Sequence, residues 1–193
     1  MLASITPLGQ RGRGASWTRT VTAYVVASAA GGAVMGAAVG ALGSLLPGLD
    51  ATAAMVVVAV LAVVAALSDL HGRPPSLHRQ VDEGWLTGYR DWVCGIGFGF
   101  QLGLGAVTIA TSASLYLTWL LELLIASPAT GALVGLVFGV ARALPILGNR
   151  TVVDPEALRQ SHRRWQQALT VVRPITVGVE AAAAVALVVA AAS

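Results

Sequence analysis

Long apolar segments alternate with shorter polar segments along the whole chain. The apolar runs cover residues 20–46, 51–67, 92–126, 129–147 and 174–192, and the polar segments cover residues 1–19, 68–91 and 148–173. A helix needs about 20 predominantly apolar residues to cross a hydrocarbon core about 30 Å thick. The pattern therefore predicts an all-α, polytopic transmembrane helix bundle that forms a single membrane domain over residues 1–193.

The run 92–126 decides how many times the chain crosses the bilayer. As one straight helix it would be about 52 Å long, which exceeds the thickness of the hydrocarbon core. As two crossings it offers about 17 residues for each and no polar turn between them. Basic residues concentrate on the cytoplasmic side of a membrane protein, so their positions can distinguish the two arrangements.

A single crossing by 92–126 places all 12 arginines on or near one side, whereas two crossings move those from Arg142 onward to the other side. We therefore predict five spans, with the N-terminus in the cytoplasm and the C-terminus outside the cell inner membrane. The long third helix would then be tilted, or kinked near its glycines. The alternative is six spans, or a re-entrant segment near residues 112–114.

The polar segment 148–173 contains a recognisable helix start. Asp154 can cap the first turn, Pro155 suits the first helical position, and Glu156 adds an acid where the helix dipole favours one. Leu158, Trp165, Leu169 and Val172 then fall on one face. This pattern predicts a cytoplasmic amphipathic helix on the membrane surface.

Glycines recur four residues apart in three of the apolar runs, which places each set on one helix face. These are Gly32, Gly36 and Gly40, then Gly95, Gly99 and Gly103, then Gly131, Gly135 and Gly139. Lipid provides no hydrophobic drive for helix association, so small residues that allow close backbone approach promote it. We expect tight helix packing at these glycines, within the chain or in a homo-oligomer.

Two charged residues fall at similar predicted depth in the membrane. Glu180 lies six residues after Pro174, and Arg142 lies about five residues before the end of the fourth run. An isolated charge at membrane depth costs at least about 2.5–3.5 kcal/mol, so a partner is expected. An ion pair between them is one hypothesis. The alternative is that Arg142 extends to the headgroups while Glu180 is neutral or faces water.

A set of polar side chains follows one face of the run 92–126 in steps of three or four residues. Its members are Gln101, Thr108, Thr111, Ser112, Thr118 and Glu122. The stripe predicts either a polar path with Glu122 at its outer mouth, or a row of hydrogen bonds that join helices.

Composition supports the membrane location and excludes several other functions. Apolar residues make up 56% of the chain, charged residues 11%, and the mean hydropathy is +0.76. A soluble domain averages about 25% charged residues. The net charge of +3 comes from arginines in the loops, which indicates membrane orientation and not nucleic-acid binding. Cys94 is the only cysteine, so an internal disulfide or a Cys-x-x-Cys pair is excluded.

No catalytic constellation, metal-ligand set or cofactor motif is evident, so the sequence favours a protein that is not an enzyme. The leading prediction is a transporter, or the membrane subunit of a transport system, for a small solute or ion. The alternative is a non-catalytic accessory or assembly subunit of a larger membrane complex. The expected partners are the lipid bilayer and either further copies of the chain or another membrane subunit.

Overall fold

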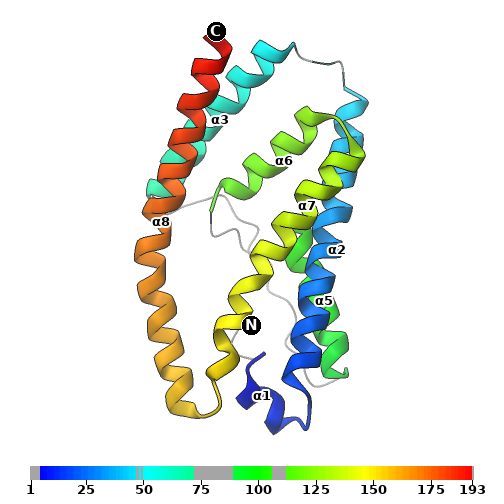
Figure 1. The fold of residues 1–193 in the computed structure, drawn as a ribbon, viewed down its shortest axis with the longest axis vertical. Helices are drawn as coiled ribbons and strands as arrows, with labels where there is room; N and C mark the ends of the chain where they lie inside the picture. Colours follow the sequence, from blue (N-terminus) through cyan, green and yellow to red (C-terminus); the bar gives the residue numbers. More distant parts are fainter. Residues whose placement is uncertain (1–4, 47, 49, 72–88, 106–111, 193) are drawn as a thin grey trace.

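The computed structural model describes residues 5–46, 48, 50–71, 89–105 and 112–192. In that part of the chain the regular structure is entirely helical. The α-helices are α1 (Pro7–Gly12), α2 (Trp17–Ser44), α3 (Ala51–His71), α5 (Asp91–Leu104), α6 (Ser114–Ile125), α7 (Pro128–Ala143) and α8 (Pro155–Ala192). A 3₁₀ segment, η1 (Leu144–Thr151), joins α7 to the loop before α8 (Figure 1).

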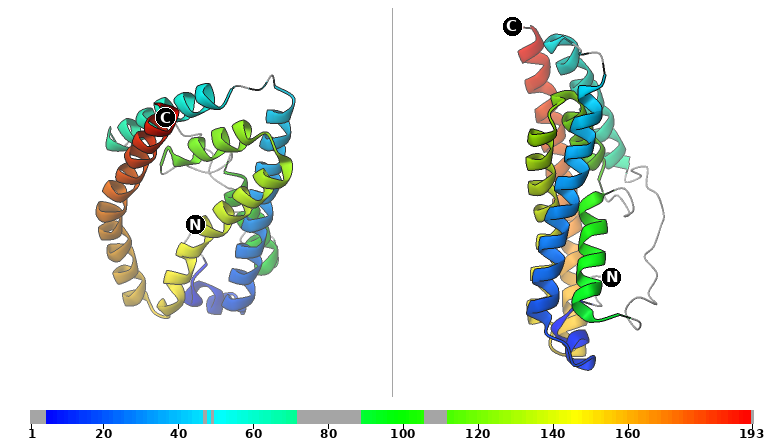
Figure 2. Two further views of the ribbon diagram at one scale, coloured as in Figure 1. Left: turned by 45° about the horizontal axis from the view of Figure 1, so that its top comes forward. Right: turned by 90° about the vertical axis from the view of Figure 1, so that its right-hand side faces the viewer.

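Helix α2 forms the centre of the main bundle, with α5 and α7 packed along it (Figures 1 and 2). The α2–α7 contact is antiparallel: Gly32 faces Gly135 and Gly36 faces Gly131. A Cβ atom on Gly32 would lie 2.8 Å from the carbonyl carbon of Gly135, and closer still to its oxygen. Only glycine allows two backbones to approach this closely. The glycines of α2 and α7 therefore meet each other within one chain.

The α2–α5 contact is parallel, and glycines again allow the two backbones to approach closely. A Cβ atom on Gly99 would lie 2.8 Å from the carbonyl carbon of Tyr24, and one on Gly103 would lie 2.8 Å from that of Ser28. The Ser28 hydroxyl also donates to the Gly139 carbonyl of α7 at 2.7 Å. Ser28 thus links all three helices at one level of the bundle.

Helices α3 and α8 form a second unit, and α6 contacts both α3 and α2. The buried residues of the α3–α8 unit include small ones: Ala59, Ala62 and Ala66 of α3 and Ala184 of α8. Large apolar side chains on the outer faces, such as Val60 and Val185, are exposed. Such outward-facing apolar surface is expected of helices that face lipid.

Among the residues that the structure describes, four helical segments are long and apolar enough to span a membrane: Trp17–Ser44, Thr52–His71, Pro128–Thr151 and Pro155–Ala191. The prediction of one long helix over 92–126 is wrong, because α5 ends at Leu104 and α6 begins only at Ser114. Gly105 follows α5 with a φ of 75°, a conformation that L side chains rarely adopt. At 1.5 Å per residue, α5 and α6 are only about 21 Å and 18 Å long.

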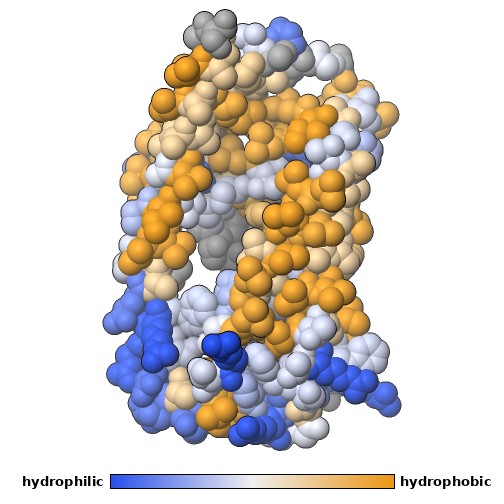
Figure 3. Space-filling view, in the orientation of Figure 1, coloured by the Kyte–Doolittle hydropathy of each residue, from blue (hydrophilic) through white to orange (hydrophobic). Residues whose placement is uncertain are grey.

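The predicted separation of a surface helix from a final span is also wrong, because α8 continues through Pro174 as one helix. Proline removes a backbone donor, but such breaks are tolerated in membrane helices. The final helix therefore couples a polar first half to an apolar second half. Figure 3 shows hydrophilic surface gathered at the end that holds α1 and the start of α8, with apolar surface above it.

Candidate functional site

Several polar side chains contact the ends of interrupted helices. The clearest case is the junction of α3 and α6. The Asp69 carboxylate, near the end of α3, accepts hydrogen bonds from the Ser112 hydroxyl at 2.6 Å and from the Ala113 backbone N–H at 2.8 Å. Ala113 is the N-cap of α6. The Asp69 carboxylate thus accepts hydrogen bonds at the N-terminus of α6. The helix dipole favours a negative charge at this position.

The end of α3 is stabilised from α8. The Arg173 guanidinium donates through Nε to the Asp69 carbonyl at 2.7 Å and through Nη2 to the Leu70 carbonyl. The last carbonyls of a helix have no partner within the helix, and a cation there also suits the helix dipole. Arg173 therefore caps α3, while the side chain of Asp69 caps α6.

Glu180 lies two helical turns beyond Arg173 on α8 and is 4% exposed. Within the described part of the chain, neither carboxylate oxygen of Glu180 has a hydrogen-bond partner. The hypothesis of an ion pair between Glu180 and Arg142 is therefore wrong, since that pair is not formed. Arg142 instead donates through Nη1 to the Leu102 carbonyl of α5 at 2.9 Å, and its guanidinium lies 5.5 Å from the centre of the Phe138 ring.

The predicted polar stripe is divided between two helices. Gln101 lies on α5, whereas Thr118 and Glu122 lie on α6, and Thr108 and Thr111 fall outside the described residues. Thr118 donates to the Ser114 carbonyl of its own helix. The side chain of Glu122 is 1% exposed and faces α2, where a Cβ atom on Gly36 would lie 2.9 Å from its Oε1 atom.

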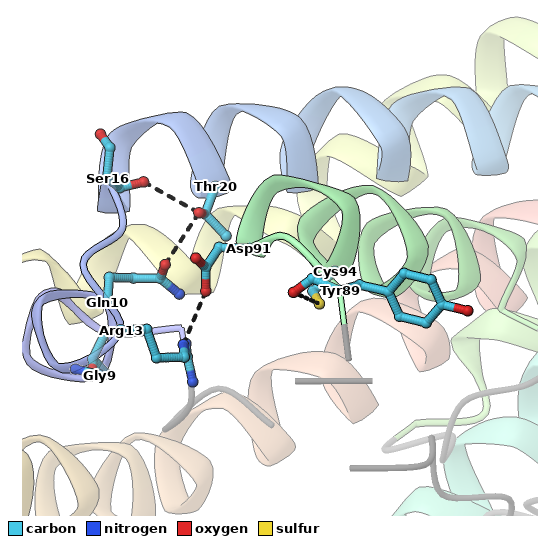
Figure 4. Close-up of polar contacts among 9 residues, drawn as sticks. Gly9, Gln10, Arg13, Ser16, Thr20, Tyr89, Asp91 and Cys94 are labelled. Carbon is cyan, nitrogen blue, oxygen red and sulfur yellow. Dashed lines mark hydrogen bonds and ion pairs between the residues drawn. The ribbon is translucent and has the colours of Figure 1, made fainter. Parts of the chain in front are cut away.

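A polar network joins α1, α2 and α5 at the hydrophilic end of the molecule (Figure 4). The Thr20 hydroxyl is within hydrogen-bond distance of the Gln10 amide oxygen (3.3 Å) and the Ser16 carbonyl (3.2 Å). Arg13 pairs with Asp91 at 2.9 Å. These contacts fix the N-terminal segment against the first turns of the bundle.

A second polar cluster joins η1 to α8 at the same end. The Asn149 side-chain oxygen accepts hydrogen bonds from the Ser161 hydroxyl at 3.0 Å and from the Trp165 indole N–H at 3.2 Å. Asn149 is 4% exposed. The Trp165 ring lies close to the backbone at Gly148, where a Cβ atom would be 2.8 Å from ring atom Cζ2.

Sequence reasoning missed Asp69, Arg173 and Asn149 as site residues. Asp69 lies two residues after the apolar run that ends at residue 67, so the pattern assigned it to a loop. A charge adjoining an apolar run is the signal that could have identified it. In the described residues, no group of three or more His, Cys, Asp or Glu is placed to hold a metal ion.

Comparisons with known proteins give one relative to report. No family model matches the chain, and no solved structure matches it. The chain is similar to the methylamine utilization protein MauF of Methylophilus methylotrophus, with 28% identity over 172 residues. The similarity covers 86% of this chain and 60% of the relative, so the chain spans about three fifths of that protein's length.

This likeness corrects the functional prediction made from the sequence. The prediction of a transporter, or of a subunit of a transport system, is wrong, because the relative is named for methylamine utilization and not for transport. The alternative prediction, an accessory or assembly subunit, agrees better with the comparison.

Proposed function

We propose that the chain is a non-catalytic accessory or assembly subunit of a multi-component membrane system, and that this system serves the utilization of methylamine or a related amine. The observation that carries the proposal is the similarity to a methylamine utilization protein over 86% of the chain. Because the match covers 86% of the chain, it includes most of the helices and is not confined to one short motif.

The surface of α8 supports an accessory role. Its first half carries Arg159, Arg163 and Arg164, all exposed, at the hydrophilic end of the molecule (Figure 3). In the bundle α8 packs mainly on α3, so much of its surface is available. A basic surface attracts an acidic partner and accelerates its association. An acidic surface of another membrane subunit therefore suits this part of α8.

We also propose the finer topology of five crossings in the cell inner membrane, with α5 and α6 together forming the third. The N-terminus would lie in the cytoplasm and the C-terminus outside. Two observations support this arrangement: α1 and the end of α8 lie at opposite ends of the molecule, and α1 shares its end with the arginine-bearing first half of α8 (Figure 1).

Deletion of the gene tests the proposed function. The deletion strain should fail to grow with methylamine as its nitrogen source, grow normally on ammonium, and recover when the wild-type chain is supplied. Uptake of radiolabelled methylamine by the same cells should be unchanged, since the chain does not transport it. Normal growth of the deletion strain on methylamine, in an organism that uses this compound, would contradict the proposal. Lost uptake would contradict the accessory role.

The topology has its own test, because Cys94 is the single cysteine. In a Cys94→Ala background, Ser44→Cys at the end of α2 should react with a membrane-impermeant maleimide on intact spheroplasts. His162→Cys in the first half of α8 should react only after the membrane is permeabilised. Labelling of both positions from the same side would refute the proposed arrangement.

A further inference from the structure

A hollow of about 520 Å³ lies between η1 and the first turns of α8. Its wall includes polar side chains from both segments, namely Thr151, Gln160, Ser161 and Arg164. Trp165 and Ala168 add apolar surface. The hollow thus combines hydrogen-bond donors, one guanidinium and an aromatic ring.

The wall of this hollow is held in place by buried contacts. The Asn149 side chain is 4% exposed, and its oxygen accepts hydrogen bonds from both Ser161 and Trp165. The close approach of the Trp165 ring to Gly148 requires a residue without a side chain at that position. A binding site is more precise when such contacts fix the rotamers of its wall.

The arginines of α8 differ in what they face. Arg159 and Arg163 lie 2.7 Å and 3.7 Å from the carboxylate of Glu156. Arg164 lines the hollow, and in the part of the chain that the structure describes it forms no ion pair. A guanidinium is a preferred partner for phosphate, because its N–H groups match the geometry of the phosphate oxygens.

The position of the hollow limits what can occupy it. The segments that line it, η1 and the first turns of α8, lie at the hydrophilic end of the molecule (Figure 1), and apolar surface lies above this end (Figure 3). Tryptophan is enriched at the level of lipid headgroups, and basic pockets at that level bind anionic headgroups. A ligand with a phosphate at one end and an apolar body at the other fits both parts of the wall.

We propose that this hollow binds the headgroup of an anionic phospholipid of the phosphatidylglycerol class. Arg164 pairs with the phosphate, Thr151 and Gln160 supply further hydrogen bonds, and Trp165 and Ala168 contact the start of the acyl chains. The bound lipid joins η1 to α8 and fixes the angle at which the polar half of α8 leaves the bundle. This site goes beyond the proposed function, although it shares Arg164 with the basic surface of α8 described above.

Thermal unfolding of the purified full chain in a neutral detergent tests the site. Dioleoyl-phosphatidylglycerol should raise the unfolding temperature by roughly 3–6 °C at about ten times its dissociation constant, and dioleoyl-phosphatidylcholine should not. Arg164→Gln should raise the dissociation constant for phosphatidylglycerol at least about tenfold. Arg163→Gln, the neighbouring residue that faces Glu156, should leave the effect intact and serves as the matched control.

Two further measurements separate the alternatives. Inorganic phosphate alone should give no shift, and an equal shift would show a free-phosphate site in place of a lipid site. Phosphatidylglycerol brominated near the headgroup should quench tryptophan fluorescence, and Trp165→Phe should remove most of that quenching. Equal losses in Arg163→Gln and Arg164→Gln would overturn the proposal, because they would reflect general attraction to an anionic surface. Equal effects of the two lipids would overturn it as well.

Discussion

Replacement of Gly32 by alanine should force α2 and α7 apart. The new Cβ atom would lie 2.8 Å from the carbonyl carbon of Gly135, whereas ordinary van der Waals contact begins at 3.4 Å. The obstructing atoms belong to the backbone, so they cannot rotate away as a side chain can. The helices must therefore separate locally by at least about 0.6 Å, the shortfall between these two distances.

The loss of free energy of unfolding in Gly32→Ala follows from the lost contact between α2 and α7. A gap of about 0.5–1 Å forfeits a quarter to a half of the dispersion energy of each atom pair. Overpacking of this kind costs typically about 1–3 kcal/mol, against a gain of up to about 1 kcal/mol from the higher helix propensity of alanine. We expect Gly32→Ala to lower the free energy of unfolding by roughly 1–2 kcal/mol.

Gly178 provides the matched control, because a Cβ atom there would meet no heavy atom within 4 Å in the described residues beyond the backbone of its own helix. Gly178→Ala should be neutral or stabilising by up to about 1 kcal/mol. Unfolding by sodium dodecyl sulfate in mixed micelles, followed by circular dichroism, measures both variants. Gly135→Ala creates the reciprocal clash with Gly32, so a single separation of α2 from α7 relieves both clashes. The double variant should thus lose at least about 0.5 kcal/mol less of the free energy of unfolding than the two single variants lose in sum. Equal effects of Gly32→Ala and Gly178→Ala, or strict additivity of the pair, would refute this reasoning.

Three further predictions test the polar contacts and the packing. Asp69→Ala should lower the free energy of unfolding by about 1–3 kcal/mol in the same assay, because the buried Ala113 N–H loses its acceptor; no loss would contradict the cap. Asn149→Ala should shift the Trp165 resonance in ¹⁹F NMR of the 5-fluorotryptophan-labelled protein, whose indole N–H then loses its partner; an unmoved resonance would contradict this contact. Cys94, 3% exposed, should react with a maleimide–polyethylene glycol reagent only after unfolding, as a gel shift would show, and rapid reaction of the folded protein would contradict its burial.

The sequence predicts where the helices lie better than it predicts where they break. Hydropathy identifies the apolar runs because each residue contributes to it locally. The interruption after α5 depends on the positive φ of Gly105, and the composition of the run does not record a backbone angle. The spacing of the glycines indicates close packing, but it cannot say that Gly32 faces Gly135 while Gly103 faces Ser28. Pairing between helices is a tertiary property that one sequence leaves open.

The error over Arg142 shows why charges at membrane depth are difficult to assign from sequence. The ion-pair hypothesis assumed that a buried cation requires an acidic side chain. In the structure Arg142 donates to the Leu102 carbonyl near the end of α5, and Arg173 donates to the carbonyls of Asp69 and Leu70 at the end of α3.

Both arginines therefore supply donors at helix ends, where backbone carbonyls lack a full set of partners. The Asp69 carboxylate does the converse at the start of α6, where backbone N–H groups lack acceptors. An interrupted helix in a bilayer exposes such groups where water is scarce, and each must be satisfied within the protein. Asp69, Arg142 and Arg173 are thus explained by helix ends, since every interruption creates backbone groups that a charged side chain can satisfy. Glu122 and Glu180 are buried within α6 and α8, and no helix end explains them.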